Sequence, residues 1–388
     1  MVQLLERLSQ YWNKIQGTLF PWLEEELEPL TNKQQQLIQI LELVRIEQFL
    51  PDRFGFEGRP QDSRSAIARA FVAKMVYNMD TTVTLIERLS SDKSLRRICG
   101  WEIKSQIPSE STFSRAFAEF AVSALPQRVH DALIKETLKE EIISHVSRDS
   151  TAITAREKPQ LKSCDKEHST PEKTTQKKRG RPKKGEERPI SEPEPTRIEK
   201  QLNISLEEML ADMPTACNIG AKKNSKGNIE YWIGFKLHLD TVDGGIPVSG
   251  VISSASMHDS QAAIPLAVMT AEKITNLYDL MDAAYDDPNI INHSKSLGHV
   301  PLVDKNPRRD KNLKEEMENE AKARKTINWK PAEAMRYNER STAERANARL
   351  KDEFGARKLR VRGITKVACH LMFGVLVLAA DQLMKLVT

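Results

Sequence analysis

Residues 337–351 read Tyr-Asn-Glu-Arg-Ser-Thr-Ala-Glu-Arg-Ala-Asn-Ala-Arg-Leu-Lys, and the spacing of four side chains within them predicts one functional helix face. These side chains are Tyr337, Arg340, Glu344 and Lys351. At about 100° per helical residue they project within a stripe roughly 60° wide. A carboxylate binds divalent metal ions and Arg or Lys binds phosphate oxygens, so the stripe suits phosphodiester chemistry. A solvated helix with ordinary charge pairs is the alternative interpretation.

Further carboxylates upstream are needed, because two metal ions over one phosphate take ligands from separate parts of a fold. Asp149 ends the β-prone run 142–149 and precedes small hydroxylated residues; a turn acid is the alternative. Asp282 ends the apolar run 277–282, at a strand terminus, which is where α/β folds place their chemistry.

Three other acids compete with Asp282: Asp279, Asp286 and Asp287. Asp286 or Asp287 better suits the N-cap of the helix that Pro288 opens. The second acid is therefore predicted to be Asp282.

Together these motifs resemble bacterial insertion-sequence transposases of the DDE type, in the group with a Tyr-Arg-Glu-Lys signature. Two residues separate Tyr337 from Arg340, three separate Arg340 from Glu344 and six separate Glu344 from Lys351, which matches the signature spacing completely. Asp149-Ser-Thr and Asp282-Ala-Ala-Tyr-Asp resemble the family's first and second acid motifs. The resemblance covers most of residues 40–388.

The resemblance implies a ribonuclease-H-like core that binds two Mg²⁺ ions, with Mn²⁺ as a substitute. The implied catalytic residues and metal ligands are Asp149, Asp282 and Glu344. The implied phosphate contacts are Tyr337, Arg340 and Lys351. Double-stranded DNA is the implied partner, as terminal inverted repeats and as target, with a homodimer in the synaptic complex. The implied reaction is cleavage, excision through a hairpin and transfer of the freed 3′ ends.

The fold class predicted from the pattern is α+β, with an all-helical N-terminal domain over residues 1–140. Apolar residues recur there at intervals of three and four, as in 37–46 and 65–76. A helix at 95–99 followed by one near 109–117 resembles a helix-turn-helix. It would present Ser109, Ser111, Thr112 and Arg115 to DNA. A structural helix with a polar cap is an equal alternative.

Residues 141–388 are predicted to form the catalytic domain, a mixed five-stranded sheet with flanking helices. Apolar residues alternate strictly over 229–240, and Asp243-Gly-Gly predicts a hairpin into the next strand. The strands of Asp149 and Asp282 and a later run at 300–304 complete the sheet. This order is that of a ribonuclease-H-like domain.

A flexible basic insertion is predicted at about 156–226. Within 156–200, 14 Lys or Arg stand against 9 Asp or Glu, with too few apolar residues to offset the entropy of ordering. The segment 177–184 resembles an AT-hook, whose core lies in a narrow minor groove. Its predicted DNA contacts are Arg179, Gly180, Arg181 and Pro182. A generic basic linker is the alternative.

The 388-residue length is enough for two or three domains, and a net charge of +5 suits an anionic partner. The four cysteines have neither the spacing of a zinc site nor that of a disulfide framework. The sequence contains no phosphate-binding loop of the kind found in nucleotide-hydrolysing enzymes. Acidic residues among the first thirty argue against a signal peptide. The apolar run 367–380 is too short for a membrane span and predicts a buried helix. We expect a cytoplasmic, nucleoid-associated bacterial protein with neither a membrane partner nor a nucleotide cofactor.

Two smaller sequence signals are better explained by structural roles than by catalysis. His258 and Asp259 suit a structural turn better than acid–base catalysis, and Trp329 suits a core position better than stacking on an extruded base. Two other functions stay open: a catalytically inactive or regulatory DNA-binding derivative, and a metal-dependent nuclease without strand transfer.

Overall fold

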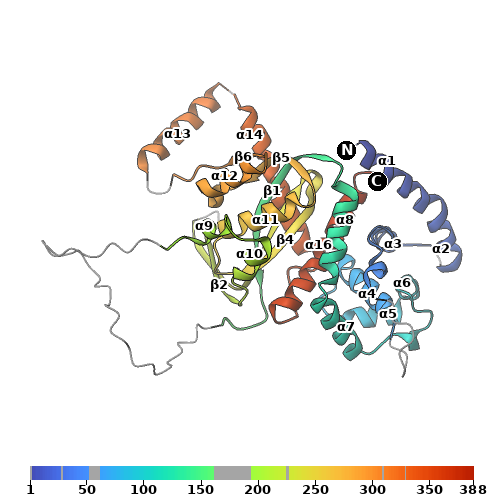
Figure 1. Ribbon diagram of the computed structural model, residues 1–388. Helices are drawn as coiled ribbons and strands as arrows, with labels where there is room; N and C mark the ends of the chain where they lie inside the picture. Colours follow the sequence, from blue (N-terminus) through green and yellow to red (C-terminus); the bar gives the residue numbers. More distant parts are fainter. Residues whose placement is uncertain are drawn as a thin grey trace, which may run out of the picture.

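Helices at the N-terminus lead into a mixed sheet that further helices flank (Figure 1). The computed structural model describes residues 2–27, 29–51, 62–160, 194–223, 227–307, 310–327 and 329–388. The AT-hook-like segment 177–184, with its predicted contacts Arg179, Gly180, Arg181 and Pro182, lies outside the described residues.

The N-terminal helices begin at residues that satisfy their free N–H groups. Thr31 and Gln34 form a capping box, and the Asp92 carboxylate accepts from the N–H of Leu95. The helices are α1 (Val2–Lys14), α2 (Phe20–Leu27), α3 (Asn32–Val44), α4 (Arg64–Val76), α5 (Thr82–Ser91), α6 (Lys93–Cys99), α7 (Glu110–Val122) and α8 (Leu125–Leu138).

The sheet contains six strands among the described residues: β1 (Ile142–Thr154), β2 (Asn218–Lys223), β3 (Ile229–Val242), β4 (Ile246–Ser254), β5 (Thr275–Met281) and β6 (Val300–Val303). β3 pairs antiparallel with β1, β2 and β4, whereas β1–β5 and β5–β6 are parallel. The five predicted strands are therefore confirmed, in a mixed sheet. β2 was not predicted, because Asn-Ile-Gly-Ala-Lys-Lys lacks apolar alternation.

Helices cover both faces of the sheet. Alternate side chains of a strand point to opposite faces. Leu237 and Leu239 belong to the apolar core shared with the last two helices, whereas Asp240 accepts from Thr270 on the other side. These helices are α9 (Arg197–Gln201), α10 (Leu206–Asp212), α11 (Ala263–Ala271), α12 (Pro288–Ser296), α13 (Lys311–Thr326), α14 (Ala332–Tyr337), α15 (Ser341–Glu353) and α16 (Ile364–Met384).

α16 joins the helical region to the sheet. It contacts α3, α4, α7 and α8 on one side and β4 on the other, and one apolar cluster runs through all of them. Phe373 stacks near Phe71 and Phe117. Within the described part of the chain, α16 is the one helix long and apolar enough to span a membrane, but most of it is buried, as predicted for this run. The predicted domain boundary at residue 140 stays a prediction, and the core crosses it.

The face of β3 predicted to be apolar is only partly covered. Phe235 and Leu237 are buried, whereas Ile229 and Tyr231 are exposed. Pairing with β4 begins at Phe235, so the earlier residues extend beyond it beside β2. Alternation in the sequence predicts the strand but not the extent of its cover.

Part of the segment predicted as a flexible insertion is regular structure instead. Thr196 and Ser205 each begin a helix with a capping box, α9 and α10, and the buried Ile198 and Met209 pack on the sheet domain. The prediction was wrong for residues 194–223, because charge and proline content over the whole stretch masked these short capped elements.

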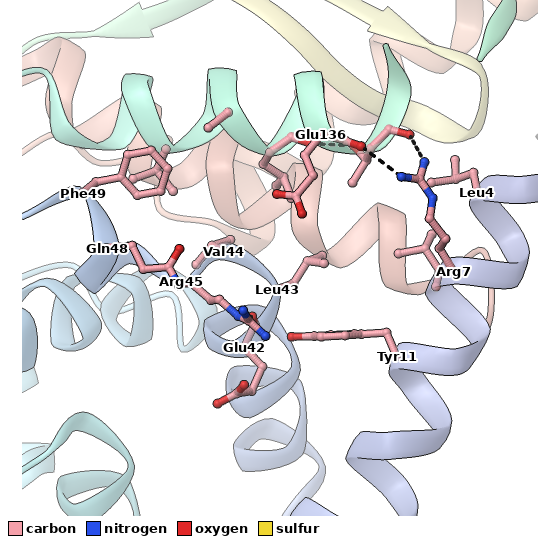
Figure 2. A pocket seen from close by; sticks show the side chains of 15 residues that line it. Leu4, Arg7, Tyr11, Glu42, Leu43, Val44, Arg45, Gln48, Phe49 and Glu136 are labelled. Atoms are coloured by element: carbon pink, nitrogen blue, oxygen red, sulfur yellow. Dashed lines mark hydrogen bonds between the residues drawn. The ribbon is translucent and has the colours of Figure 1, made fainter. Parts of the chain in front are cut away.

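α1 packs against α8 across a cavity of about 280 Å³ (Figure 2). The Arg7 guanidinium donates to the carbonyls of Glu136 and Thr137 near the end of α8, where cations are favourable. The Leu4 N–H donates to the Glu141 carboxylate. These contacts hold α1 on the helical region, and the cavity is not lined by any of the predicted catalytic acids.

Candidate active site

Asp149 and Asp282 lie next to one another on parallel strands. Arg148 on β1 stands opposite Met281, the last residue of β5, so each acid directly follows one of these paired residues. β1 continues to Thr154, so the strand end predicted at Asp149 was wrong, whereas the one predicted at Asp282 is confirmed. Asp282 directly follows β5 and opens a short 3₁₀ turn, η6 (Ala283–Tyr285), where its carboxylate accepts from the N–H of Ala284 at 2.9 Å. The two carboxylates therefore meet where chemistry is expected in such sheets.

Burial and repulsion act against the charge of both acids. Burial is the main cause that raises the pKa of Asp149 to about 6, and Asp282 adds to it. The Ser150 N–H, the Asn347 side chain and Arg340 act in the opposite direction. Burial also raises the pKa of Asp282. Two adjacent carboxylates with raised pKa values are characteristic of functional sites.

The strand beneath the acid pair is fixed by a buried ion pair. The Arg148 guanidinium donates to both oxygens of Asp240, at 2.8 and 2.7 Å, and Thr270 donates to the same carboxylate. Because these groups satisfy one another, they position β1 without competing for a ligand at the acid pair.

Glu344 lies in the first turn of α15, with 54% of its side chain exposed, and forms an ion pair with Arg340 at 2.6 Å. Asn347, three residues later, donates to the Asp149 carboxylate at 3.0 Å. α15 therefore lies beside the acid pair. Among the described residues, however, no three His, Cys, Asp or Glu side chains are grouped closely enough to hold a metal ion. The structure thus brings Asp149 and Asp282 together and leaves Glu344 paired with Arg340.

The residues present fit a divalent cation. Carboxylate oxygens are the ligands that Mg²⁺ and Mn²⁺ prefer. Arg340 supplies positive charge that lowers the pKa of both Asp149 and Asp282, although not enough to offset burial. A cation bound by Asp149 and Asp282 would offset the remaining effect of burial on their pKa values. The metal-binding roles of the acids stay predictions.

The stretch 337–351 is not one continuous helix. α14 ends at Tyr337, a 3₁₀ turn, η7 (Asn338–Arg340), follows, and α15 begins at Ser341. The prediction of one unbroken α-helix was therefore wrong, but the shared face is kept: at about 120° per residue, the three steps of a 3₁₀ turn return Arg340 to the side of Tyr337. Local contacts nevertheless hold the group together.

Tyr337 faces a further acid, Asp304, and carries Arg340 over its ring. The Tyr337 hydroxyl donates to Asp304 at 2.7 Å, and the Arg340 guanidinium lies 5.7 Å from the centre of the Tyr337 ring. Burial, followed by the contact with Asp304, raises the pKa of Tyr337 above its ordinary value. Burial acts against the charge of Arg340, but Tyr337 and Glu344 outweigh it and raise its pKa.

Lys351 connects the acid pair with other cations. Burial lowers its pKa, and Lys222 on β2 and Arg357 lower it further, whereas Asp149 acts in the opposite direction. Lys351 therefore lies within electrostatic reach of Asp149 and of two exposed cations. A phosphate group would relieve this crowding of positive charge.

Sequence reasoning missed three groups at this site. Asn347 could have been found from its position three residues after Glu344, on the same helix face. Asp304 carried no motif. Asp259 does begin a turn, as predicted, but it also accepts from Lys236 at 2.8 Å and contributes to the raised pKa of Asp282.

The competing acids have other partners. Asp287 caps α12, as predicted, and Asp286 accepts from the N–H of Asn306. Asp279 is buried with Ser294 and His299. Geometry therefore favours Asp282.

Trp329 lies in the connection between α13 and α14, which project from the sheet (Figure 1). Its side chain is 54% exposed, so the core position predicted for it was wrong. The arginine Arg324 lies 5.8 Å from the ring centre. The exposure arises because α13 contributes no buried residue against which the ring could pack.

α7, the predicted recognition helix, has two distinct sides. Phe113 and Phe117 pack on Phe71 in the core, as a structural helix requires. Ser111 and Arg115 are exposed on the other side. Both interpretations of this helix remain compatible with its packing.

Comparisons with known proteins agree with this architecture. The family model described as Transposase DDE domain matches residues 141–379, and a model described as Transposase domain matches residues 23–119. No curated protein and no solved structure gives a significant match. Because the first model covers more than half of the chain, the protein belongs to the DDE transposase family.

Proposed function

We propose that the protein cleaves DNA at the ends of an insertion sequence and transfers the freed 3′ ends into target DNA. The observation that supports this most directly is the placement of Asp149 and Asp282 on adjacent parallel strands, both with a raised pKa. The chain's membership of the Tyr-Arg-Glu-Lys group is part of the proposal.

Asp149, Asp282 and Glu344 are the proposed metal ligands and catalytic residues. Two Mg²⁺ ions, or Mn²⁺ in their place, would activate the attacking hydroxyl and stabilise the leaving oxygen in an in-line displacement. Asn347 orients Asp149 through its hydrogen bond. The Glu344 carboxylate forms an ion pair with Arg340, so it would bind Arg340 and the metal ion together when it acts as a ligand.

Tyr337, Arg340 and Lys351 are the proposed contacts of the DNA phosphate at the element's end. Arg340 and Lys351 act electrostatically on Asp149, so a phosphate between them would lie beside the acid pair. The Tyr337 hydroxyl, now bound to Asp304, is a donor that a phosphate oxygen can accept instead.

Trp329 is proposed to stack on a base at the cleaved end. Its ring is exposed and rigid, and stacking on an aromatic side chain stabilises an unpaired base by about 1–3 kcal/mol. Stacking on an extruded base was the alternative to a core position for Trp329 in the sequence.

The wider proposal includes terminal inverted repeats and target DNA as partners, a homodimer in the synaptic complex, a cytoplasmic, nucleoid-associated location and the basic segment 177–184 as a minor-groove contact.

Linear DNA with flanking terminal repeats, incubated with the protein, Mg²⁺ and a target plasmid, tests the function. Cleavage with joined products is expected, and Asp149→Asn should give neither. Cleavage without joining would instead identify a nuclease. DNA binding without either product would identify a regulatory derivative.

A further inference from the structure

A cavity of about 780 Å³ lies between the helical region and the segment that leads into α16. Five cationic side chains line it: Lys74, Arg156, Arg360, Arg362 and Lys366. Two acids do so as well, Asp80 and Glu110. The lining is therefore strongly cationic, and it is separate from the acid pair.

The positive charge of this cavity is not neutralised by the protein. The Asp80 carboxylate forms an ion pair with Lys358, whose Nζ lies 3.0 Å away. Of the two acids that line the cavity, Glu110 is therefore the one that Lys358 does not neutralise. Across the described residues, neither a hydrogen bond nor an ion pair engages the side chains of Arg156, Arg360, Arg362 or Lys366. A multiply charged anion would satisfy several of them together.

Lys74 is the observation that distinguishes this cavity from an ordinary basic surface. Its side chain is only 5% exposed, and within the described parts of the chain no hydrogen bond or ion pair partners its ammonium group. Burial lowers its pKa to about 8, with Asp80 acting weakly in the opposite direction. Lys74 thus has a buried side chain that lines the cavity, and an anion bound there would offset the cost of keeping its ammonium group charged.

The N-terminus of α16 faces the same region, because Arg362 and Lys366 flank its first residue. Gly363 is the N-cap; no side chain caps this end, and the first turn contains no acid. The Gly363 N–H itself donates to Glu157. The N–H groups of the first turn add favourable potential for phosphate.

We infer that this cavity is a second phosphate-binding site, which binds backbone phosphates of the same DNA that is cut at the acid pair. The inference rests on the proposed function. Lys351 lies near Asp149 and Arg357, and the chain continues from Arg357 to Arg360 and Arg362 at the cavity. Cations therefore recur along the chain segment that leads from Lys351, near Asp149, to the cavity.

Salt-dependent binding of a terminal-repeat duplex, measured in EDTA, tests the site apart from catalysis. Arg360→Ala with Arg362→Ala should reduce the slope of log K against log salt by about 2, since each phosphate contact contributes about 0.9. Lys135→Ala with Lys139→Ala removes equal charge from two exposed positions, one on α8 and one directly after it, and is the matched control. An unchanged slope, or an equal change in the control, would overturn the inference.

Lys74→Met separates binding from folding. Because burial acts against the charge of Lys74, the substitution should raise Tm, while duplex affinity falls about tenfold through the lost charged contact. A higher Tm with undiminished affinity would contradict the inference.

Titration with inorganic triphosphate distinguishes the source of the phosphate. If triphosphate binds the wild type but not the Arg360/Arg362 variant, and that variant keeps the wild-type DNA slope, the site serves a small phosphorylated molecule and the inference fails. Asp149→Asn should retain the wild-type slope. Cleavage by Asp149→Asn would refute the proposed function without affecting this inference.

Discussion

At the residue scale, Asp149 carries the clearest conflict between folding and function. Its carboxylate is buried beside Asp282, and Asn347 and Arg340 only partly compensate. Such strain in the metal-free protein is what a cation would relieve. The sequence placed Asp149 in a β-prone run but ended that run too early, because β1 continues to Thr154. The spacing of Asn347 from Glu344 puts both on one helix face, but its contact with Asp149 also depends on how α15 packs.

Asp149→Asn should stabilise the metal-free protein above pH 6. The folded-state pKa of about 6 exceeds the ordinary 3.8, so stability is full at low pH and is lost as pH rises through 6. The substitution should therefore restore about 2–3 kcal/mol at pH 8 and little at pH 4. Thermal unfolding in EDTA across this range measures the difference. Glu207→Gln, an exposed change of equal charge, is the control; a pH-independent effect of Asp149→Asn would refute the assignment.

Arg340→Gln should raise the pKa of both Asp149 and Asp282, because the Arg340 charge lowers both in the wild type. Titration of the two carboxyl carbons by NMR measures this directly. Arg345→Gln, on the adjoining helix α15, serves as the comparison. Unshifted titrations in the Arg340 variant would mean that Arg340 does not face the pair.

At the element scale, α14, η7 and α15 show where periodicity is an incomplete guide. The spacing of the Tyr337–Lys351 stretch predicted one α-helix, whereas residues 338–340 form a 3₁₀ turn between α14 and α15, and the Tyr337 hydroxyl donates to Asp304. The amino-acid composition of a 3₁₀ turn does not differ from that of an α-helix. Side-chain contacts therefore decide which of the two conformations such a segment adopts. Similarly, the exposure of Trp329 depends on the absence of buried residues from α13.

Trp329→Ala should leave stability nearly unchanged and impair cleavage. A side chain that is half exposed contributes little to folding, less than about 1 kcal/mol. Loss of stacking should reduce cleavage of the terminal-repeat duplex about tenfold or more, and Trp329→Phe should restore most of it. If Trp329→Ala and the wild type unfold at the same temperature and cleave the duplex at the same rate, Trp329 takes no part in cleavage.

At the scale of the whole molecule, α16 makes the helical region and the sheet interdependent. Its side chains complete one apolar core with α4, α7 and α8. The end of α15 also approaches α16 closely, since a Cβ at Gly374 would meet the Phe354 carbonyl oxygen at 2.7 Å. Five of the strands were predictable because alternation and turn residues are local signals. The shared core was not, because it depends on which distant faces meet.

Leu376→Ala should lower the free energy of unfolding by about 2–5 kcal/mol, since Leu376 is fully buried in the shared core. Both regions should still unfold in a single transition, seen by circular dichroism and by tryptophan fluorescence. Ala substitution of the exposed Val122 is the control. Separate transitions would show two independent cores.

The most direct test of the account is Mg²⁺-dependent cleavage of a terminal-repeat duplex by Glu344→Gln, with duplex binding measured in parallel. Glu344 is the acid that the structure leaves paired with Arg340 rather than with Asp149 and Asp282. If all three carboxylates form one metal site, cleavage should fall on the order of a thousandfold while binding persists. Full Mg²⁺-dependent cleavage by Glu344→Gln would contradict the proposed site.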